Sequence, residues 1–227
     1  MGAGVVTVLS PPGAVMVHAI ALEAVMVRAF ADAQALALAT SGMRAAIIGP
    51  AAGVGEATAD NVTALRNGVP ALVLDADALT SFRERPELLM AQTRSSDVLT
   101  PHEGEFERLW PGLLRGGRDA AAQAASRASG AVVVLKGAET LIAAPDGRLA
   151  LNPNGSRWLA TAGSGDVLAG MIGGLLAQGT EAFDAACMAV WIHAAAGARF
   201  GPGLIAEDLP GLLPVELGDL YEKGRTP

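Results

Sequence analysis

The residues best suited to chemistry lie in one segment, 161–170, which reads TAGSGDVLAG. Gly163 and Gly165 precede an apolar helical pattern, so backbone N–H groups would be free at the positive end of a helix dipole, where anions bind. Asp166 follows in the first turn. A carboxylate there could take a proton from a hydroxyl while the amides hold a phosphoryl group in line. The plainer alternative is that Asp166 only caps the helix between two turn glycines.

Other polar residues follow predicted strands. Asp75 and Asp77 come directly after the apolar segment 71–74, and ligands of open α/β sheets bind at the carboxyl ends of the strands. The two carboxylates could hold a cation or position a substrate hydroxyl, and a capping or turn role suits them equally. His102 stands at a strand-to-helix junction. For a lone histidine, a surface or hydrogen-bonded structural role is the ordinary alternative to ligand contact.

Two predicted loops could place backbone groups or a charged side chain next to a ligand. Residues 49–55, GPAAGVG, would allow close approach of the backbone after a strand, or would simply form a tight turn. In residues 136–140, KGAET, Lys136 could reach a phosphate while Gly137 permits a turn. An exposed salt bridge is the ordinary alternative for Lys136.

Elements of an α/β fold must position these residues. Short apolar runs predict buried strands, covered on both faces, at 4–9, 45–48, 71–74, 97–99 and 131–135. Helical patterns lie at 56–67, 119–129, 163–177 and 180–199. This alternation predicts a parallel sheet with right-handed crossovers, and segments 140–144 and 148–151 predict a hairpin that makes the sheet mixed. On the last helix, Cys187, Met188 and Trp191 are predicted to pack in the core.

Composition excludes several classes of protein. With 51% hydrophobic and 17% charged residues, the 227-residue chain can form a core, which excludes wholesale disorder. No linker divides it, so a single domain over 1–227 is predicted. A net charge of −7 argues against nucleic-acid and acidic membrane surfaces. The single cysteine rules out an internal disulfide, and no segment has the pattern of a signal peptide or a membrane span, which together indicate a cytoplasmic protein.

Segment 163–170 resembles the Gly-x-Gly-Asp signature of ribokinase-like enzymes. Four further segments make the resemblance narrower; in chain order they are 48–53, 74–79, 99–106 and 135–140. Together they are similar to the ADP/ATP-dependent NAD(P)H-hydrate dehydratases over most of the chain. The resemblance implies a ribokinase-like layered α/β fold, with a mostly parallel central sheet flanked by helices. The chain departs from the family pattern at Ala51, where a glycine is usual, and keeps the final glycine of that motif, Gly53.

The resemblance implies a role for each motif. Asp166 would be the catalytic base, with Gly163 and Gly165 forming the anion hole. The substrate, the S form of NAD(P)H hydrate, would be bound by Gly53, Asp75, Asp77, His102 and Asp166. The adenine nucleotide would be bound by Lys136, Gly137, Ala138, Glu139, Thr140 and Gly165. ADP or ATP would phosphorylate the substrate hydroxyl with the help of Mg²⁺, whose protein ligands the resemblance leaves unassigned, and loss of phosphate would restore NAD(P)H.

The resemblance also concerns assembly. The family domain begins with a further strand, a glycine-rich turn and a helix ahead of the strand at 4–9. A chain without them is expected to expose strand edges and apolar faces, and to form a homo-oligomer. In longer relatives the other half is sometimes an NAD(P)H-hydrate epimerase domain. Two alternatives stay open: a kinase for a vitamin-precursor alcohol, which would not need His102 in its present setting, and a noncatalytic domain for nucleotide binding or assembly.

Overall fold

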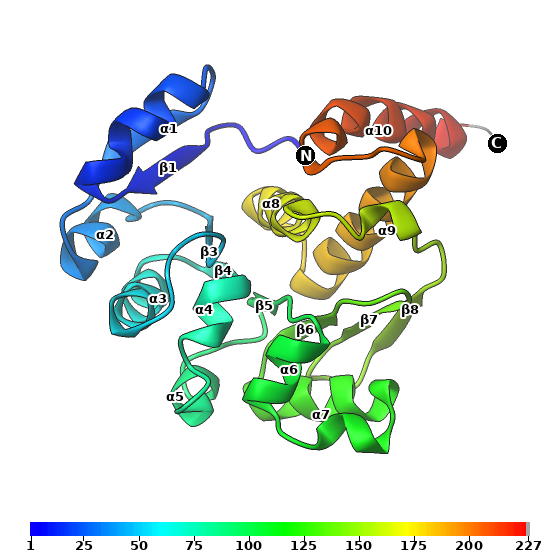
Figure 1. The fold of residues 1–227 in the computed structure, drawn as a ribbon, viewed down its shortest axis with the longest axis horizontal. Helices are drawn as coiled ribbons and strands as arrows, with labels where there is room; N and C mark the ends of the chain where they lie inside the picture. The colour runs from blue at the N-terminus through cyan, green and yellow to red at the C-terminus, as the bar shows by residue number, and fades with distance from the viewer. Residues whose placement is uncertain (226–227) are drawn as a thin grey trace.

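The computed structural model describes residues 1–225, in which a six-stranded sheet lies between two layers of helices (Figure 1). Strands β3 (Ala45–Ile48), β4 (Ala71–Leu74), β5 (Val98–Leu99) and β6 (Val132–Leu135) are parallel and adjacent in that order. The hairpin β7 (Thr140–Ala143) and β8 (Leu149–Asn152) adds two antiparallel strands. The predicted mixed sheet, mostly parallel, is confirmed. Residues 226 and 227 of the predicted domain lie outside the described part.

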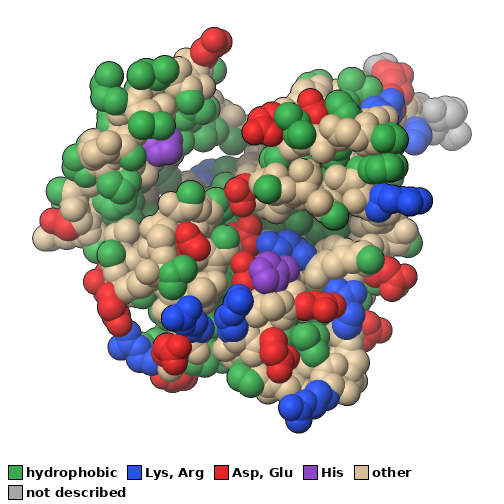
Figure 2. Space-filling view, in the orientation of Figure 1, with side chains coloured by type: hydrophobic (Ala, Val, Ile, Leu, Met, Phe, Trp, Pro, Cys, Tyr) green, Lys and Arg blue, Asp and Glu red, His purple; other side chains and the backbone are tan. Residues whose placement is uncertain are grey.

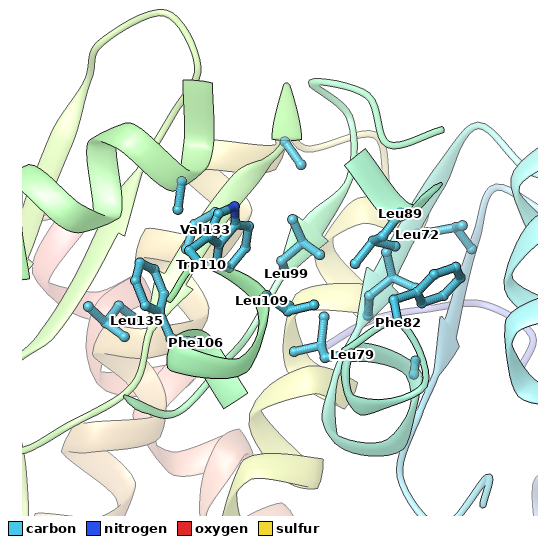
Figure 3. Close-up of a cluster of buried hydrophobic side chains, with 14 of the residues drawn as sticks. Leu72, Leu79, Phe82, Leu89, Leu99, Phe106, Leu109, Trp110, Val133 and Leu135 are labelled. Atoms are coloured by element: carbon cyan, nitrogen blue, oxygen red, sulfur yellow. The ribbon is translucent and has the colours of Figure 1, made fainter. Parts of the chain in front are cut away.

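Side chains alternate across the sheet and build two cores. Leu72, Leu74, Leu99 and Leu135 point to one side, where Figure 3 shows strand and helix side chains packed in one layer. The helices on this side are α3 (Glu56–Gly68), α4 (Ala76–Thr80), α5 (Pro86–Met90), α6 (Glu103–Leu109) and α7 (Arg118–Ser129). Val73 faces the other side, under α8 (Ser164–Ala177) and α9 (Ala182–Phe200). Coverage of both faces explains why these strands are continuous apolar runs.

The N-terminal part carries a second, smaller sheet and packs on the main core through Leu36. It contains β1 (Thr7–Ser10), α1 (Val15–Ala21), β2 (Met26–Ala29) and α2 (Ala33–Ala39), and β1 pairs in parallel with β2 in a two-stranded sheet of its own. The strand predicted at 4–9 is present in part, as β1, but the prediction of full burial is wrong. Residues 7–9 are half-buried, and Val5 and Val6, which precede the strand, are 68% and 48% exposed. A strand is fully buried only where other layers cover both of its faces, and in β1 only Leu9 packs against the main core while Ser10 is buried.

Helix α1 and strand β3 are among the elements that expose apolar side chains. Helix α1 exposes Met16, Val17 and Ile20, and the outermost strand of the main sheet, β3, exposes Ile47. On α9 the prediction of core packing is wrong for Met188 and Trp191, which are exposed. They lie on the side of the helix opposite the alanines and isoleucine that face the sheet.

Helix α10 (Leu209–Arg225) packs against α9 and completes the layer of helices that contains α8 and α9. Cys187, also on α9, is half-buried, and burial raises the pKa of its thiol to about 11. No helix within residues 1–225 combines the length and hydropathy that a bilayer span would need.

Candidate functional site

The carboxyl ends of β4 and β6 and the N-terminus of α8 meet at one place. Lys136 Nζ donates to Asp75 Oδ1 at 2.7 Å and lies 3.9 Å from Glu105 Oε2. A Cβ atom added to Gly165 would lie 3.3 Å from Lys136 Nζ and 3.8 Å from Asp75 Oδ2. The first turn of α8 therefore packs directly against an ion pair, as expected where parallel strands end at the same edge of a sheet. Figure 2 shows acidic, basic and histidine side chains gathered near the centre of the molecular surface that is turned toward the viewer.

Asp166 lies in that first turn of α8, and its environment favours the protonated form. Burial is the main cause that raises the pKa of its carboxyl, followed by the negative charge of Asp75, with a smaller contribution from Asp77; the charge of Lys136 opposes the rise. No side-chain hydrogen bond caps the N-terminus of α8, which begins after Gly163 in the left-handed region at φ 83°. Gly163 is the N-cap of α8 and Asp166 is not, so the capping role left open for Asp166 is not realised.

The loop after β3 is tied to α4. Gly53 N–H donates to Asp77 Oδ2 at 2.9 Å, so these two predicted substrate residues contact each other. Gly49 has φ 134°, and a Cβ atom there would lie 1.7 Å from the Asp75 carbonyl oxygen, so only glycine fits. Ala51 has φ 53°, in the left-handed region. A glycine, usual at this position in the family pattern, would avoid a strain of about 1 kcal/mol.

His102 is the N-cap of α6. Its Nδ1 accepts from the N–H groups of Gly104 at 2.9 Å and Glu105 at 3.3 Å, while Glu105 Oε2 accepts from His102 N–H at 2.9 Å. The hydrogen-bonded structural role is therefore realised. Because Nδ1 accepts these hydrogen bonds, the proton of the neutral ring is on Nε2. Nε2 lies 3.4 Å from Glu105 Oε1, and the His102 side chain is 54% exposed. This N–H can still donate to a ligand.

Of the predicted nucleotide residues, those at 136–139 form the loop between β6 and β7, Thr140 begins β7, and Gly165 lies in the first turn of α8. Gly137, Ala138 and Glu139 are exposed, and Thr140 Oγ1 donates to Gly137 O at 3.3 Å. Lys136 N–H donates to Pro101 O at 2.9 Å, which joins this loop to the strand end that precedes His102. The structure thus brings the substrate, catalytic and nucleotide candidates to one edge of the sheet. The sequence patterns single out neither Arg118, which contacts this loop, nor His193.

His193 lies on α9 beneath the start of α8, at 7% exposure. Burial lowers the pKa of its imidazole to about 4, helped by the charge of Lys136, although an interaction with the backbone of Ser164 acts in the opposite direction. Its Nε2 is buried with no hydrogen-bond partner within the described structure. His193 is therefore neutral at pH 7.

This burial predicts a pH-dependent stability. The ordinary pKa of 6.5 falls to about 4 on folding, so the unfolded chain binds more protons between these values, and folding stability falls as the pH drops through this window. Between pH 7 and pH 4.5, the free energy of unfolding should fall by about 2 kcal/mol less in His193→Gln than in the unaltered chain. Urea unfolding at both pH values measures this, with His18→Gln on α1 as the control. An unchanged pH dependence in His193→Gln would refute the assignment.

Comparison with known proteins shows the family of this chain. The family model described as NAD(P)H-hydrate dehydratase matches residues 1–215. The chain belongs to this family. It is 46% identical over 182 residues to the "Bifunctional NAD(P)H-hydrate repair enzyme Nnr" of Gloeobacter violaceus. That alignment covers 77% of this chain and 35% of the relative, so the chain spans about a third of that protein's length.

Solved structures agree with the family. The ADP/ATP-dependent NAD(P)H-hydrate dehydratase of Bacillus subtilis, co-crystallized with ATP/Mg²⁺, superposes with a TM-score of 0.78 at 27% identity, covering 96% of this chain and 80% of that one. A ribokinase-like superfamily protein of Enterococcus faecalis gives a TM-score of 0.81 at 25% identity, covering 95% of this chain and 77% of that one. The fold of this dehydratase-family chain is therefore ribokinase-like, as predicted.

Proposed function

We propose that this chain dehydrates the S form of NAD(P)H hydrate to NAD(P)H at the expense of ADP or ATP. One observation carries the proposal: in a chain of the dehydratase family, the carboxylate of Asp166 stands in the first turn of α8, beside the Lys136–Asp75 ion pair. A base, a cation and free backbone N–H groups are thereby available at one anion-binding helix end.

The reaction follows from these groups. Asp166 takes the proton from the hydroxyl of the hydrated nicotinamide ring, whose oxygen attacks the terminal phosphoryl group. The bond to the leaving nucleotide breaks, giving AMP from ADP or ADP from ATP. The C–O bond to the phosphorylated hydroxyl then breaks and inorganic phosphate leaves. A proton is lost from the adjacent ring carbon to solvent, and its electron pair forms the ring double bond. The N–H groups of Gly163 and Gly165, together with Lys136, stabilise the negative charge on the transferring phosphoryl group.

Mg²⁺ fits this donor set. Among residues 1–225 no group of three or more His, Cys, Asp or Glu side chains is arranged to hold a metal ion. Mg²⁺ at nucleotide sites is held mainly by phosphate oxygens and waters with one or two carboxylates. Asp75, whose Oδ2 faces the first turn of α8, would supply one such carboxylate, and the ion would neutralise phosphate charge.

The two ligands would bind on either side of Asp166. The hydrated nicotinamide nucleotide would contact Gly53, Asp77 and the Nε2–H of His102. The adenine nucleotide would lie against the exposed loop 136–140 and Gly165. Support comes from geometry, because both groups of residues border the Asp75–Lys136 pair.

Assembly forms part of the same proposal. The exposed side chains of Met16, Val17 and Ile20 on α1 suit a contact between copies in a homo-oligomer. The name of the Gloeobacter violaceus relative describes a bifunctional enzyme, which supports an NAD(P)H-hydrate epimerase domain as a partner. The acidic net charge of −7 and the lone cysteine support action in the cytoplasm.

Turnover of the S-form hydrate tests the proposal. The chain is incubated with S-form NADH hydrate, Mg²⁺ and either ADP or ATP, while NADH absorbance is recorded and nucleotides are separated by chromatography. NADH with AMP and phosphate is expected from ADP, and NADH with ADP and phosphate from ATP. A phosphorylated alcohol without free phosphate would support the kinase alternative. Nucleotide binding without NADH or phosphate would support the noncatalytic one.

A further inference from the structure

We infer that Arg118 is a positioning residue that holds the nucleotide loop, residues 136–140, in its binding conformation; this rests on the proposed function. Arg118 begins α7, and its side chain reaches back to the end of β6. Its Nη1 donates to Glu139 O at 2.6 Å, and its Nη2 donates to Leu135 O at 3.4 Å and Lys136 O at 3.3 Å. One guanidinium thus binds three carbonyl groups in and beside the loop.

Gly137 is required by this contact. A Cβ atom at Gly137 would lie 2.4 Å from Arg118 Nη2 and 3.1 Å from Cζ. Gly137 is not among the glycines with φ above zero, so its backbone would accept an alanine. The glycine therefore makes room for the guanidinium and does not serve a special turn.

The same side chain reaches the substrate side of the site. Arg118 Nε lies 3.0 Å from Glu103 Oε1. Glu103 directly follows His102, the N-cap of α6. Arg118 therefore connects the loop proposed for the adenine nucleotide with the helix end proposed for the hydrated nicotinamide.

These contacts explain how an exposed loop is held in place. Gly137, Ala138 and Glu139 are exposed and have few side-chain atoms to pack. The loop carbonyls accept hydrogen bonds from one rigid, planar guanidinium. These bonds keep the loop ordered before the nucleotide binds. An ordered loop loses less conformational entropy on binding, and this strengthens binding without changing the chemical step.

The test is a separation of KM from kcat. Arg118→Met should raise the KM for the nucleotide about tenfold, which is the loss of roughly one charged hydrogen bond, while kcat stays close to that of the unaltered enzyme. Arg118→Lys should recover only part, because one ammonium cannot span three carbonyls. Arg127→Met, an exposed arginine on the same helix, is the control and should change neither constant.

A double-variant comparison tests the role of Gly137. Gly137→Ala should also raise the nucleotide KM, since its methyl group displaces the guanidinium. Combining it with Arg118→Met should raise KM by less than the product of the two single effects. Fully multiplicative effects would refute the coupling between Gly137 and Arg118.

Direct binding separates this inference from the proposed reaction. Titration calorimetry of ATP with Mg²⁺ needs no turnover, and the dissociation constant of Arg118→Met should be about tenfold above that of the unaltered chain. If Arg118→Met does not fold, Arg118→Lys is used in its place. Its dissociation constant should lie between that of the unaltered chain and the tenfold higher value expected for Arg118→Met. Unchanged dissociation constants, or a lower kcat with an unchanged nucleotide KM, would overturn the assignment.

Discussion

Asp166→Asn is expected to lower kcat for NADH formation by about 10²- to 10⁴-fold, which is the range for loss of a positioned general base. The amide has nearly the same shape but cannot take the hydroxyl proton. KM for the nucleotide should change little, because the Gly163 and Gly165 amides and Lys136 remain. Steady-state kinetics with S-form NADH hydrate measure both constants. An Asp166→Asn enzyme that keeps most of its activity would exclude Asp166 as the base.

The same variant should be at least as stable as the unaltered chain, which separates lost catalysis from lost folding. Burial and the charge of Asp75 raise the pKa of the Asp166 carboxyl, so the folded state binds its proton more tightly than the unfolded state. This contribution to stability is present at low pH and is lost as the pH rises through the raised pKa. At pH 7 the carboxylate is disfavoured in the fold, and an uncharged Asn removes that cost. A higher or equal Tm is expected, and a lower one would argue that Asp166 has a structural role.

Gly49→Ala should have the largest effect on folding, with a loss of about 3 kcal/mol or more. The substitution puts an L side chain at φ 134°, with its Cβ atom 1.7 Å from the Asp75 carbonyl oxygen. Relief of this clash would move the end of β4 and with it the Asp75–Lys136 pair. Urea unfolding and soluble yield measure the effect.

Gly42→Ala provides the matched control. Gly42 also has a positive φ, 82°, but a Cβ atom there would meet nothing within 4 Å. Only the conformational cost of about 1 kcal/mol is expected. Equal losses in the two variants would mean that the contact between Gly49 and Asp75 does not constrain the fold.

The sequence predicts the central sheet well because its strands are locally marked. Segments 45–48 and 71–74 are apolar runs that end at Gly49-Pro50 and at Asp75, and β3 and β4 have the same bounds. The strand at 4–9 is an equally apolar run, yet its residues Val5 and Val6 are exposed. Burial of a strand depends on layers contributed by distant segments, which a local pattern does not contain.

The site was predictable in position but not in its contacts. Strand-end placement and the resemblance both pointed to Asp75 and Lys136, but their ion pair joins residues 61 positions apart. Arg118 had no distinguishing pattern, because its main partners are backbone carbonyls, which every residue has. His102 has the structural role, since its Nδ1 caps α6, and the contact of its Nε2–H with a ligand stays a prediction.

An isotope experiment tests the central claim, that the substrate hydroxyl is phosphorylated before it leaves. S-form NADH hydrate carrying ¹⁸O in its ring hydroxyl is turned over with ADP or ATP, and the phosphate is analysed by mass spectrometry. Attack of that oxygen on the phosphoryl group predicts one ¹⁸O atom in each inorganic phosphate released. Label in water, with unlabelled phosphate, would mean that the hydroxyl leaves without attacking the nucleotide and would contradict the role of Asp166 as its base.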